Sequence, residues 1–247
     1  MVVGNWKMYV NTLAEGKKIL KEIDKKFPRG VKNDVVICPP NALAVALRAG
    51  YGGKRIAFGG QDVFWEKEGA FTGMVSPKSL ASSGLTYVMV GHAERREFGD
   101  SNEVVAKKLA AAYEAGLHPI LCVGEKERDE DGGHFTELAK EVTQSVARLD
   151  ASSASRLTIA YEPVWAIGAP EAPAPRIAEE AIVYIRKTLA DLWGRERALK
   201  VRIIYGGAVD SISAPKFAAH RGIQGVLLGR ASVNAEEFTA VVKAFSQ

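Results

Sequence analysis

The chain has 247 residues, of which 47% are hydrophobic and 25% charged, the composition of an ordinary globular protein. Its net charge of +4 is spread over interleaved acidic and basic residues. Even the densest basic stretch, residues 17–26, carries Glu22 and Asp24, so no nucleic-acid-binding stripe is expected. No apolar run approaches 18 residues, so no membrane span is expected either.

The two cysteines, Cys38 and Cys122, stand in separate apolar runs and form no CxxC pair, which favours reduced thiols in a reducing compartment. Residues 1–9 show no basic region followed by an apolar stretch, so no secretory signal is expected and the predicted location is the cytoplasm. No metal site is predicted, because no metal-ligand spacing relates the four histidines at positions 92, 118, 134 and 220.

Short apolar runs rich in β-branched residues punctuate the chain and predict eight strands. Several are apolar at every position, which is typical of strands covered on both faces. In chain order the predicted strands are Val2–Val3, Val35–Cys38, Ile56–Phe58, Tyr87–Val90, Pro119–Val123, Leu157–Tyr161, Val201–Tyr205 and Gly225–Leu228.

Segments with helical spacing of apolar residues lie between these runs. Alternation of strand and helix indicates βαβ units and a parallel sheet. Eight units favour a closed α/β barrel, a (β/α)8 fold forming one domain over residues 1–247. The absence of a GxGxxG turn after the first strand weakens the dinucleotide-binding alternative. The clearest predicted helices are Thr12–Lys26, one capped by Asn102 that ends near Gly116, Ile177–Trp193 and Ala235–Phe245.

The segment 169–175 is rich in alanine and proline. It could pass for a linker, but a helical pattern follows it directly. We therefore interpret it as a stiffened loop and not as a domain boundary.

Polar residues follow several of the predicted strands, and in a (β/α)8 barrel catalytic groups collect at the C-terminal strand ends. Glu162 follows an apolar strand and suits a general base. His92 precedes a short helix, so its ring would be neutral and could donate a hydrogen bond to a carbonyl. Lys7 would supply a fixed positive charge for a developing anion or a phosphate. Taken singly, each also fits a structural role: a rim ion pair, a satisfied histidine or a solvated lysine.

Glycines open the loops after the seventh and eighth predicted strands. Backbone N–H groups at Gly206–Gly207 and Gly229, beside a helix N-terminus, would form an anion site. Phosphate sites recur at this position of the fold. The apolar segment Pro163–Gly168 follows the sixth strand and predicts a lid that excludes water, although a loop packed permanently into the surface is the alternative.

Four segments in the right order resemble the signature sequences of the triosephosphate isomerase family. They are Gly4–Met8, Gly91–Arg96, Cys122–Glu125 and Ala160–Gly168, and the resemblance extends from Gly4 to Ser232. It implies an enzyme that isomerises a small phosphorylated sugar. The enzyme would interconvert dihydroxyacetone phosphate and D-glyceraldehyde 3-phosphate through an enediolate and without a cofactor.

The resemblance also implies a role for each site residue. Glu162 would abstract a carbon-bound proton, neutral His92 would polarise the oxygens, and Asn5 and Lys7 would contact the substrate. Backbone N–H groups of Gly168, Ala208, Gly229 and Arg230 would hold the phosphate, under a lid made of Pro163, Val164, Trp165, Ala166, Ile167 and Gly168. The loop containing Phe64–Trp65 and Gly69–Gly73 would dock into a second subunit, which implies a homodimer.

Several residues depart from the family pattern: Ala93 and Ala208 replace serines, Met74 a glutamate, Arg230 a glycine and Ala169–Pro170 a threonine-glycine pair. Arg95 thereby loses its expected glutamate partner. Arg230 and Trp65 also resemble a branch of the family that isomerises L-erythrulose 1-phosphate, so that reaction is an alternative. A barrel that binds sugar phosphates without turnover is a third, against which the retained site residues weigh.

Overall fold

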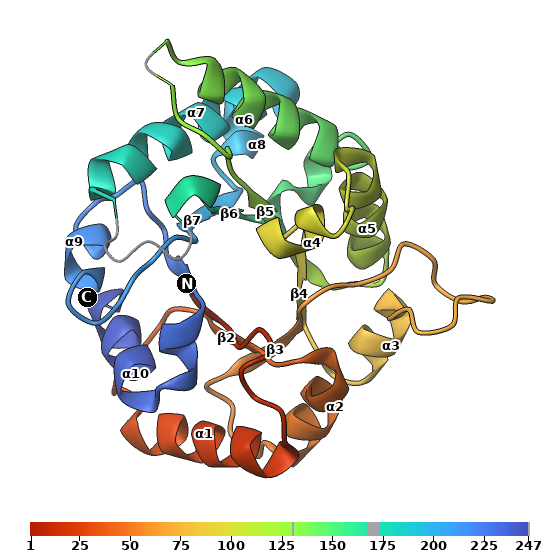
Figure 1. Cartoon of the computed structure of the whole chain (residues 1–247), viewed down its shortest axis with the longest axis vertical. Helices are drawn as coiled ribbons and strands as arrows, with labels where there is room; N and C mark the ends of the chain where they lie inside the picture. The colour runs from red at the N-terminus through yellow and green to blue at the C-terminus, as the bar shows by residue number, and fades with distance from the viewer. Residues whose placement is uncertain (130, 167–172, 247) are drawn as a thin grey trace.

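The chain forms a closed barrel of eight parallel strands, seen in a computed structural model that describes residues 1–129, 131–166 and 173–246. The strands follow one another in sequence order, and the first pairs with the last, Val2 beside Val226. Figure 1 shows the strands in the middle and the helices in a ring around them. The (β/α)8 fold predicted from the alternating pattern is confirmed.

All eight predicted strands are present, with ends that differ by one or two residues from the sequence prediction. The third begins at Ala57, one residue later than predicted, and extends to Gly60. The strands are β1 Val2–Asn5, β2 Val35–Cys38, β3 Ala57–Gly60, β4 Tyr87–Val90, β5 His118–Val123, β6 Thr158–Tyr161, β7 Arg202–Tyr205 and β8 Val226–Leu228.

Helices cover the outside of the barrel, and those predicted from sequence are confirmed. The α-helices are α1 Leu13–Lys26, α2 Asn41–Gly50, α3 Pro77–Ser82, α4 Ala93–Glu97, α5 Asn102–Glu114, α6 Gly133–Ser145, α7 Pro175–Trp193, α8 Arg195–Ala198, α9 Ala214–Ala218 and α10 Ala235–Ala244. The described residues also form short 3-10 helices, namely η1 Ala151–Ser155, η2 Val164–Ala166 and η3 Arg230–Val233.

The predicted cap of α5 is wrong by one residue. Ser101 is the N-cap, and its hydroxyl accepts a hydrogen bond from the N–H of Val104. Asn102 is already helical, and its side chain instead accepts from Arg96 at 2.6 Å and donates to Gln144. Serine and asparagine cap about equally well, so only these tertiary contacts decide between them.

The apolar strands are buried on both sides, as their continuous hydrophobicity predicts. Val2, Val35 and Ile37 belong to the layer between strands and helices, whereas Val3 and Val36 point into the barrel. The interior is filled by Met1, Val3, Val36, Cys38, Met89, Ile120, Cys122, Ala160, Ile204 and Leu227. The barrel is therefore a packed core on which the rim residues stand.

Across the described ranges, no helix has both the length and the apolar character needed to cross a membrane.

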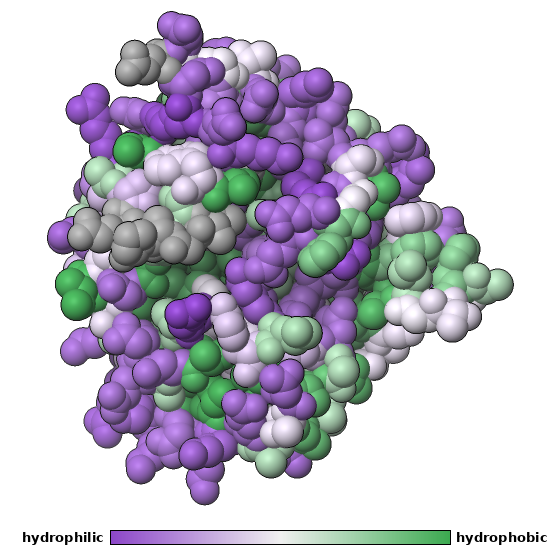
Figure 2. Space-filling view, in the orientation of Figure 1, coloured by the Kyte–Doolittle hydropathy of each residue, from purple (hydrophilic) through white to green (hydrophobic). Residues whose placement is uncertain are grey.

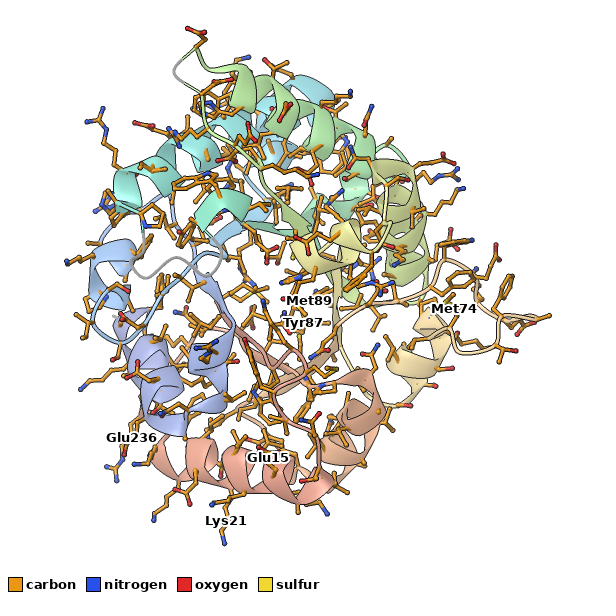
Figure 3. All side chains as sticks on the ribbon, in the orientation of Figure 1. Glu15, Lys21, Met74, Tyr87, Met89 and Glu236 are labelled. Atoms are coloured by element: carbon orange, nitrogen blue, oxygen red, sulfur yellow. The ribbon has the colours of Figure 1, made fainter. Side chains whose placement is uncertain are left out.

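Replacement of Met89 tests the packing of the interior. Met89 is 1% exposed and lies at the centre of the ring in Figure 3. Because its truncation leaves a cavity, we expect Met89→Ala to lower the free energy of unfolding by about 2–4 kcal/mol, measured by urea denaturation. Leu199→Ala, at a residue 59% exposed, serves as the control and should change it by less than about 0.5 kcal/mol. Equal losses in the two variants would contradict the packed interior.

Candidate active site

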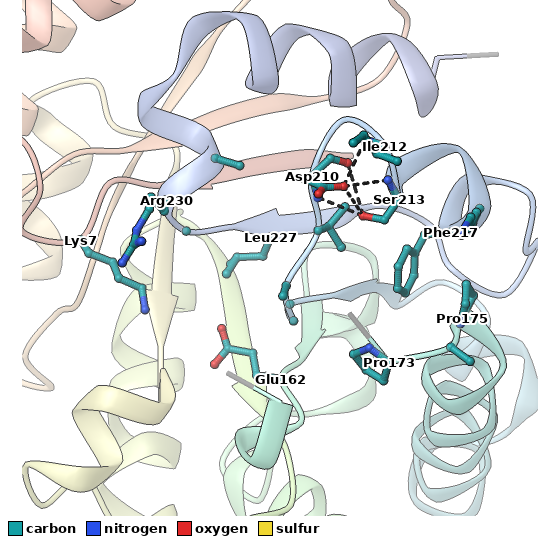
Figure 4. Close-up of a pocket in the computed structure, with 18 of the residues that line it drawn as sticks. Lys7, Glu162, Pro173, Pro175, Asp210, Ile212, Ser213, Phe217, Leu227 and Arg230 are labelled. Atoms are coloured by element: carbon teal, nitrogen blue, oxygen red, sulfur yellow. Dashed lines mark hydrogen bonds between the residues drawn. The ribbon is translucent and has the colours of Figure 1, made fainter. Parts of the chain in front are cut away.

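A cavity of about 960 Å³ opens at the C-terminal rim of the barrel, within the range of small-molecule sites. It collects residues that follow β1, β4, β6, β7 and β8, as the fold predicts. Figure 4 shows Lys7, Glu162, Leu227 and Arg230 around its centre. The predicted site residues that line it are Lys7, His92, Glu162, Ala208, Gly229 and Arg230, and Tyr9, Gly206 and Gly207 join them.

Glu162, directly after β6, is 2% exposed and held by its backbone. Its N–H donates to the carbonyl of Val123 at 2.7 Å. One carboxylate oxygen accepts from the N–H of Ala93 at 3.4 Å, and the other lies 3.5 Å from Nε2 of His92. The backbone thus gives this carboxylate a single long hydrogen bond, and the carboxylate faces the cavity.

His92 is the N-cap of α4, and this position determines which ring nitrogen faces the cavity. Its Nδ1 accepts a hydrogen bond from the N–H of Glu94 at 3.2 Å, so that nitrogen carries no proton. Nε2 is the ring nitrogen that faces Glu162. One hydrogen bond at the start of a helix thus orients the ring, and the donor role of His92 stays a prediction.

Lys7 stands at the end of β1 in a left-handed conformation, φ 46°, which is rare for a residue with a side chain. Asn5 stabilises it, because its Oδ1 accepts from the N–H of Lys7 at 2.9 Å. Gln61 donates to the carbonyl of Lys7 at 2.9 Å. The lysine Nζ forms an ion pair with Glu94 at 2.6 Å. Asn5 itself is buried behind Lys7 and is not among the residues that line the cavity.

Two neighbours of Glu162 were not predicted as parts of its surroundings. Burial, followed by the charge and hydrogen bonding of Glu162, raises the pKa of Cys122 well above its usual value, so this thiol stays protonated. Gly206 leaves room for the glutamate: a Cβ there would lie 2.6 Å from Cγ of Glu162. The sequence signals Gly206–Gly207 only as an anion loop, and the contact with β6 appears in the folded barrel.

The wall formed after β7 and β8 carries backbone donors. Ala208 and Gly229 line the cavity, and neither N–H donates to another of the described residues. Asp210 on the same loop is occupied, since its carboxylate accepts from the N–H and hydroxyl of Ser213, both at 2.7 Å. These bonds with Ser213 lower the pKa of Asp210, which keeps it ionised. The geometry fits an anion beside Ala208 and Gly229.

The segment after Glu162 begins with η2. Trp165 donates from Nε1 to Glu125 at 2.9 Å, and the hydroxyl of Tyr161 donates to the same oxygen at 2.7 Å. Burial and the carboxylate of Glu125 raise the pKa of Tyr161 far above its usual value. The first part of the predicted lid, Pro163–Ala166, is therefore anchored to the β5–α6 loop. Ile167, Gly168 and Ala169–Pro170 lie outside the described residues.

Two departures from the family pattern have structural consequences. Ala93 keeps the N–H that contacts Glu162 and brings no hydroxyl. Arg95 has a partner after all, because its Nε faces Asp62 at 2.9 Å, although the contact is an ion pair without a well-aligned hydrogen bond. Asp62 also binds buried Lys108 at 2.9 Å. Met74 is 58% exposed.

In the part of the chain that the structure describes, no three His, Cys, Asp or Glu side chains gather as a potential metal site.

The fold and the rim are those of a (β/α)8-barrel isomerase. The family model "Triosephosphate isomerase" matches residues 1–245, and the chain belongs to that family. Curated relatives named triosephosphate isomerase include those of Carboxydothermus hydrogenoformans, 42% identical over 98% of this chain and 97% of that protein, and of Moorella thermoacetica, 40% identical over the same shares. The relative from Clostridium novyi, also so named, is 40% identical over 98% and 97%.

Gly206 provides a test of how Glu162 is positioned. We expect Gly206→Ala to lower kcat of the isomerase by at least about tenfold, because the added methyl displaces the glutamate side chain. Gly52→Ala is the matched control, since a Cβ at Gly52 meets nothing within 4 Å. Steady-state rates of both variants, after circular dichroism has shown that both fold, decide the matter. An unchanged kcat in Gly206→Ala would refute the positioning role.

Proposed function

We propose that this chain interconverts dihydroxyacetone phosphate and D-glyceraldehyde 3-phosphate, a step shared by glycolysis and gluconeogenesis. Membership of the triosephosphate isomerase family supports the reaction. The observation that carries the proposal is the pair formed by Glu162 and His92, whose carboxylate and Nε2 lie 3.5 Å apart at the cavity. Moving a proton between adjacent carbons requires one base and one hydrogen-bond donor, and this pair supplies both.

In the proposed mechanism, Glu162 removes the proton from C1 of dihydroxyacetone phosphate and leaves an enediolate. The same carboxylate, now protonated, returns a proton to C2 and yields glyceraldehyde 3-phosphate. His92 donates from Nε2 to the carbonyl oxygen and then relays a proton between the two oxygens, so the overall reaction consumes and releases nothing. No redox change occurs, and no cofactor enters the proposal.

The remaining groups bind and enclose the substrate in this proposal. Lys7 offsets the negative charge of the enediolate, and Asn5 acts by holding Lys7 in its left-handed conformation. Backbone N–H groups of Gly168, Ala208, Gly229 and Arg230 hold the phosphate. The lid, Pro163–Gly168, closes over the site and excludes water from the enediolate.

The four-carbon substrate L-erythrulose 1-phosphate is the reference against which specificity is measured. The relatives described above are named for the triose reaction and give the tetrulose reaction no support. We expect kcat/KM for glyceraldehyde 3-phosphate to exceed that for L-erythrulose 1-phosphate. The reverse preference would overturn the proposed substrate, and turnover of neither would leave a barrel that only binds sugar phosphates.

The base is tested by Glu162→Asp. Shortening the side chain by one methylene withdraws the carboxylate by roughly 1 Å, and we expect kcat to fall about a hundredfold while KM changes little. The surface variant Glu196→Asp controls for the chemical change and should retain full activity, because Glu196 is exposed and pairs with Lys200 on the outside of α8. If Glu162→Asp is as active as the control, Glu162 is not the base.

We further propose that the enzyme is a homodimer. The loop between β3 and α3 projects from the barrel in Figure 1. Its side of the molecule is pale and green, and therefore apolar, in Figure 2. Phe71 at its turn is 43% exposed and packs against Phe64 with the rings tilted by 50° and their centroids 4.8 Å apart, so the loop is braced by its own aromatic contacts. Exposed Met8 and Met74 add apolar surface that a monomer would leave in water.

Sedimentation equilibrium tests the dimer. We expect the parent chain to have about twice the protomer mass of 26.6 kDa, and Phe71→Asp to shift the mass toward one protomer because it buries a charge in the interface. Leu192→Asp is the control, since Leu192 on α7 has the same exposure of 43% and should leave the dimer intact. A monomeric parent would refute the proposal.

The predicted location remains the cytoplasm. Cys38 and Cys122 are both free and buried, and burial raises the pKa of Cys38 to about 12. Such thiols suit a reducing compartment.

A further inference from the structure

Arg230 is the first residue of η3 and directly follows Gly229 on the cavity wall. Its side chain is exposed, and the guanidinium carbon lies 5.8 Å from the centroid of the Tyr9 ring. Figure 4 shows the side chains of Arg230 and Lys7 next to each other on the side of the cavity that Glu162 faces. Two cationic side chains therefore share one wall of the site.

The charges of these two cations are balanced differently. Lys7 forms an ion pair with Glu94 at 2.6 Å. Arg230 forms no ion pair with any of the described residues, and Asp210, another acid that lines the cavity, is bonded to its own loop. A guanidinium is always charged and offers five N–H donors. The wall thus carries a solvent-exposed cation that can exchange water for an anionic ligand in the cavity.

We propose that the Arg230 guanidinium is a side-chain ligand of the substrate phosphate, added to the backbone donors of the same wall. The inference rests on the proposed function. In the proposed function the phosphate accepts hydrogen bonds from the N–H groups of Gly229 and Arg230, and the side chain of Arg230 extends from the same position. A guanidinium binds phosphate oxygens through two parallel hydrogen bonds. The added ligand suits a site in which Ala208 contributes an N–H and no hydroxyl.

Tyr9 has a positioning role in this arrangement. Its ring lies beneath the guanidinium and restricts a long flexible side chain to the rim of the cavity, which lowers the entropy that Arg230 loses on binding. Tyr9 is in turn held by its N–H, which donates to the carbonyl of Trp6 at 3.0 Å.

The contact has a distinct kinetic signature. The phosphate takes no part in the bond changes, so the Arg230 contact is the same in the ground state and the transition state. Loss of such a contact raises KM and leaves kcat nearly unchanged. Loss of Glu162 or of its positioning acts on kcat instead, which separates the two roles.

The experiment measures the dissociation constant of inorganic phosphate by isothermal titration on the full-length chain. We expect Arg230→Gln to weaken phosphate binding by about tenfold or more, as for loss of a charge-assisted hydrogen bond, and to raise KM by a similar factor. Arg230→Lys should recover only part of the affinity, because an ammonium lacks the two-pronged geometry.

Arg221→Gln is the matched control. Arg221 is exposed, lies outside the cavity and carries the same charge, so its removal should leave phosphate binding within about twofold. Equal weakening in Arg221→Gln and Arg230→Gln would reduce the effect to net charge and overturn the proposal. Phosphate binding by Arg230→Gln as tight as by the parent would overturn it as well.

A double-mutant cycle tests the part played by Tyr9. Tyr9→Leu should weaken phosphate binding in the parent and have no further effect in Arg230→Gln, because the ring acts through the guanidinium. Independent, additive effects would refute that coupling. Titration with phosphate requires no turnover, so it tests the Arg230 proposal alone. The isomerase assay of the parent chain tests the proposed function separately.

Discussion

Closure of the barrel between β1 and β8 is the constraint on which the rest of the structure depends. The pairing of Val2 with Val226 brings the first and last strands side by side, and all eight strands run in the same direction. Residues that follow separate strands consequently meet on one rim. Lys7 and Arg230 are more than two hundred positions apart in the sequence and become neighbours only because β1 and β8 are adjacent.

The N-terminus of α4 contacts several residues of the site. The N–H of Ala93 contacts the carboxylate of Glu162, and the next N–H, that of Glu94, bonds Nδ1 of His92. One helix N-terminus therefore contacts both the carboxylate of Glu162 and the ring of His92. The side chain of Glu94 forms an ion pair with Lys7, so three of the rim residues contact a helix of five residues.

Burial around the site serves to keep groups in a single protonation state. Cys122 and Tyr161 lie within the core beside carboxylates, and both effects hold their pKa values high. Cys122 and Tyr161 therefore stay neutral beside the carboxylates of Glu162 and Glu125. The absence of a side chain at Gly206 leaves a volume that the side chain of Glu162 fills.

The sequence by itself determined the strands, several of the helices, the resemblance to the family and most of the rim residues, because apolar periodicity and residue type are local properties. It did not decide whether Ser101 or Asn102 caps α5, since both side chains can do so and the choice follows from the contacts of Asn102 with Arg96 and Gln144. Nor could it show that Arg95 finds Asp62, or that Gly206 makes room for Glu162. Those relations join segments tens of residues apart, and only the closed barrel, by fixing which strands are neighbours, places them within contact distance.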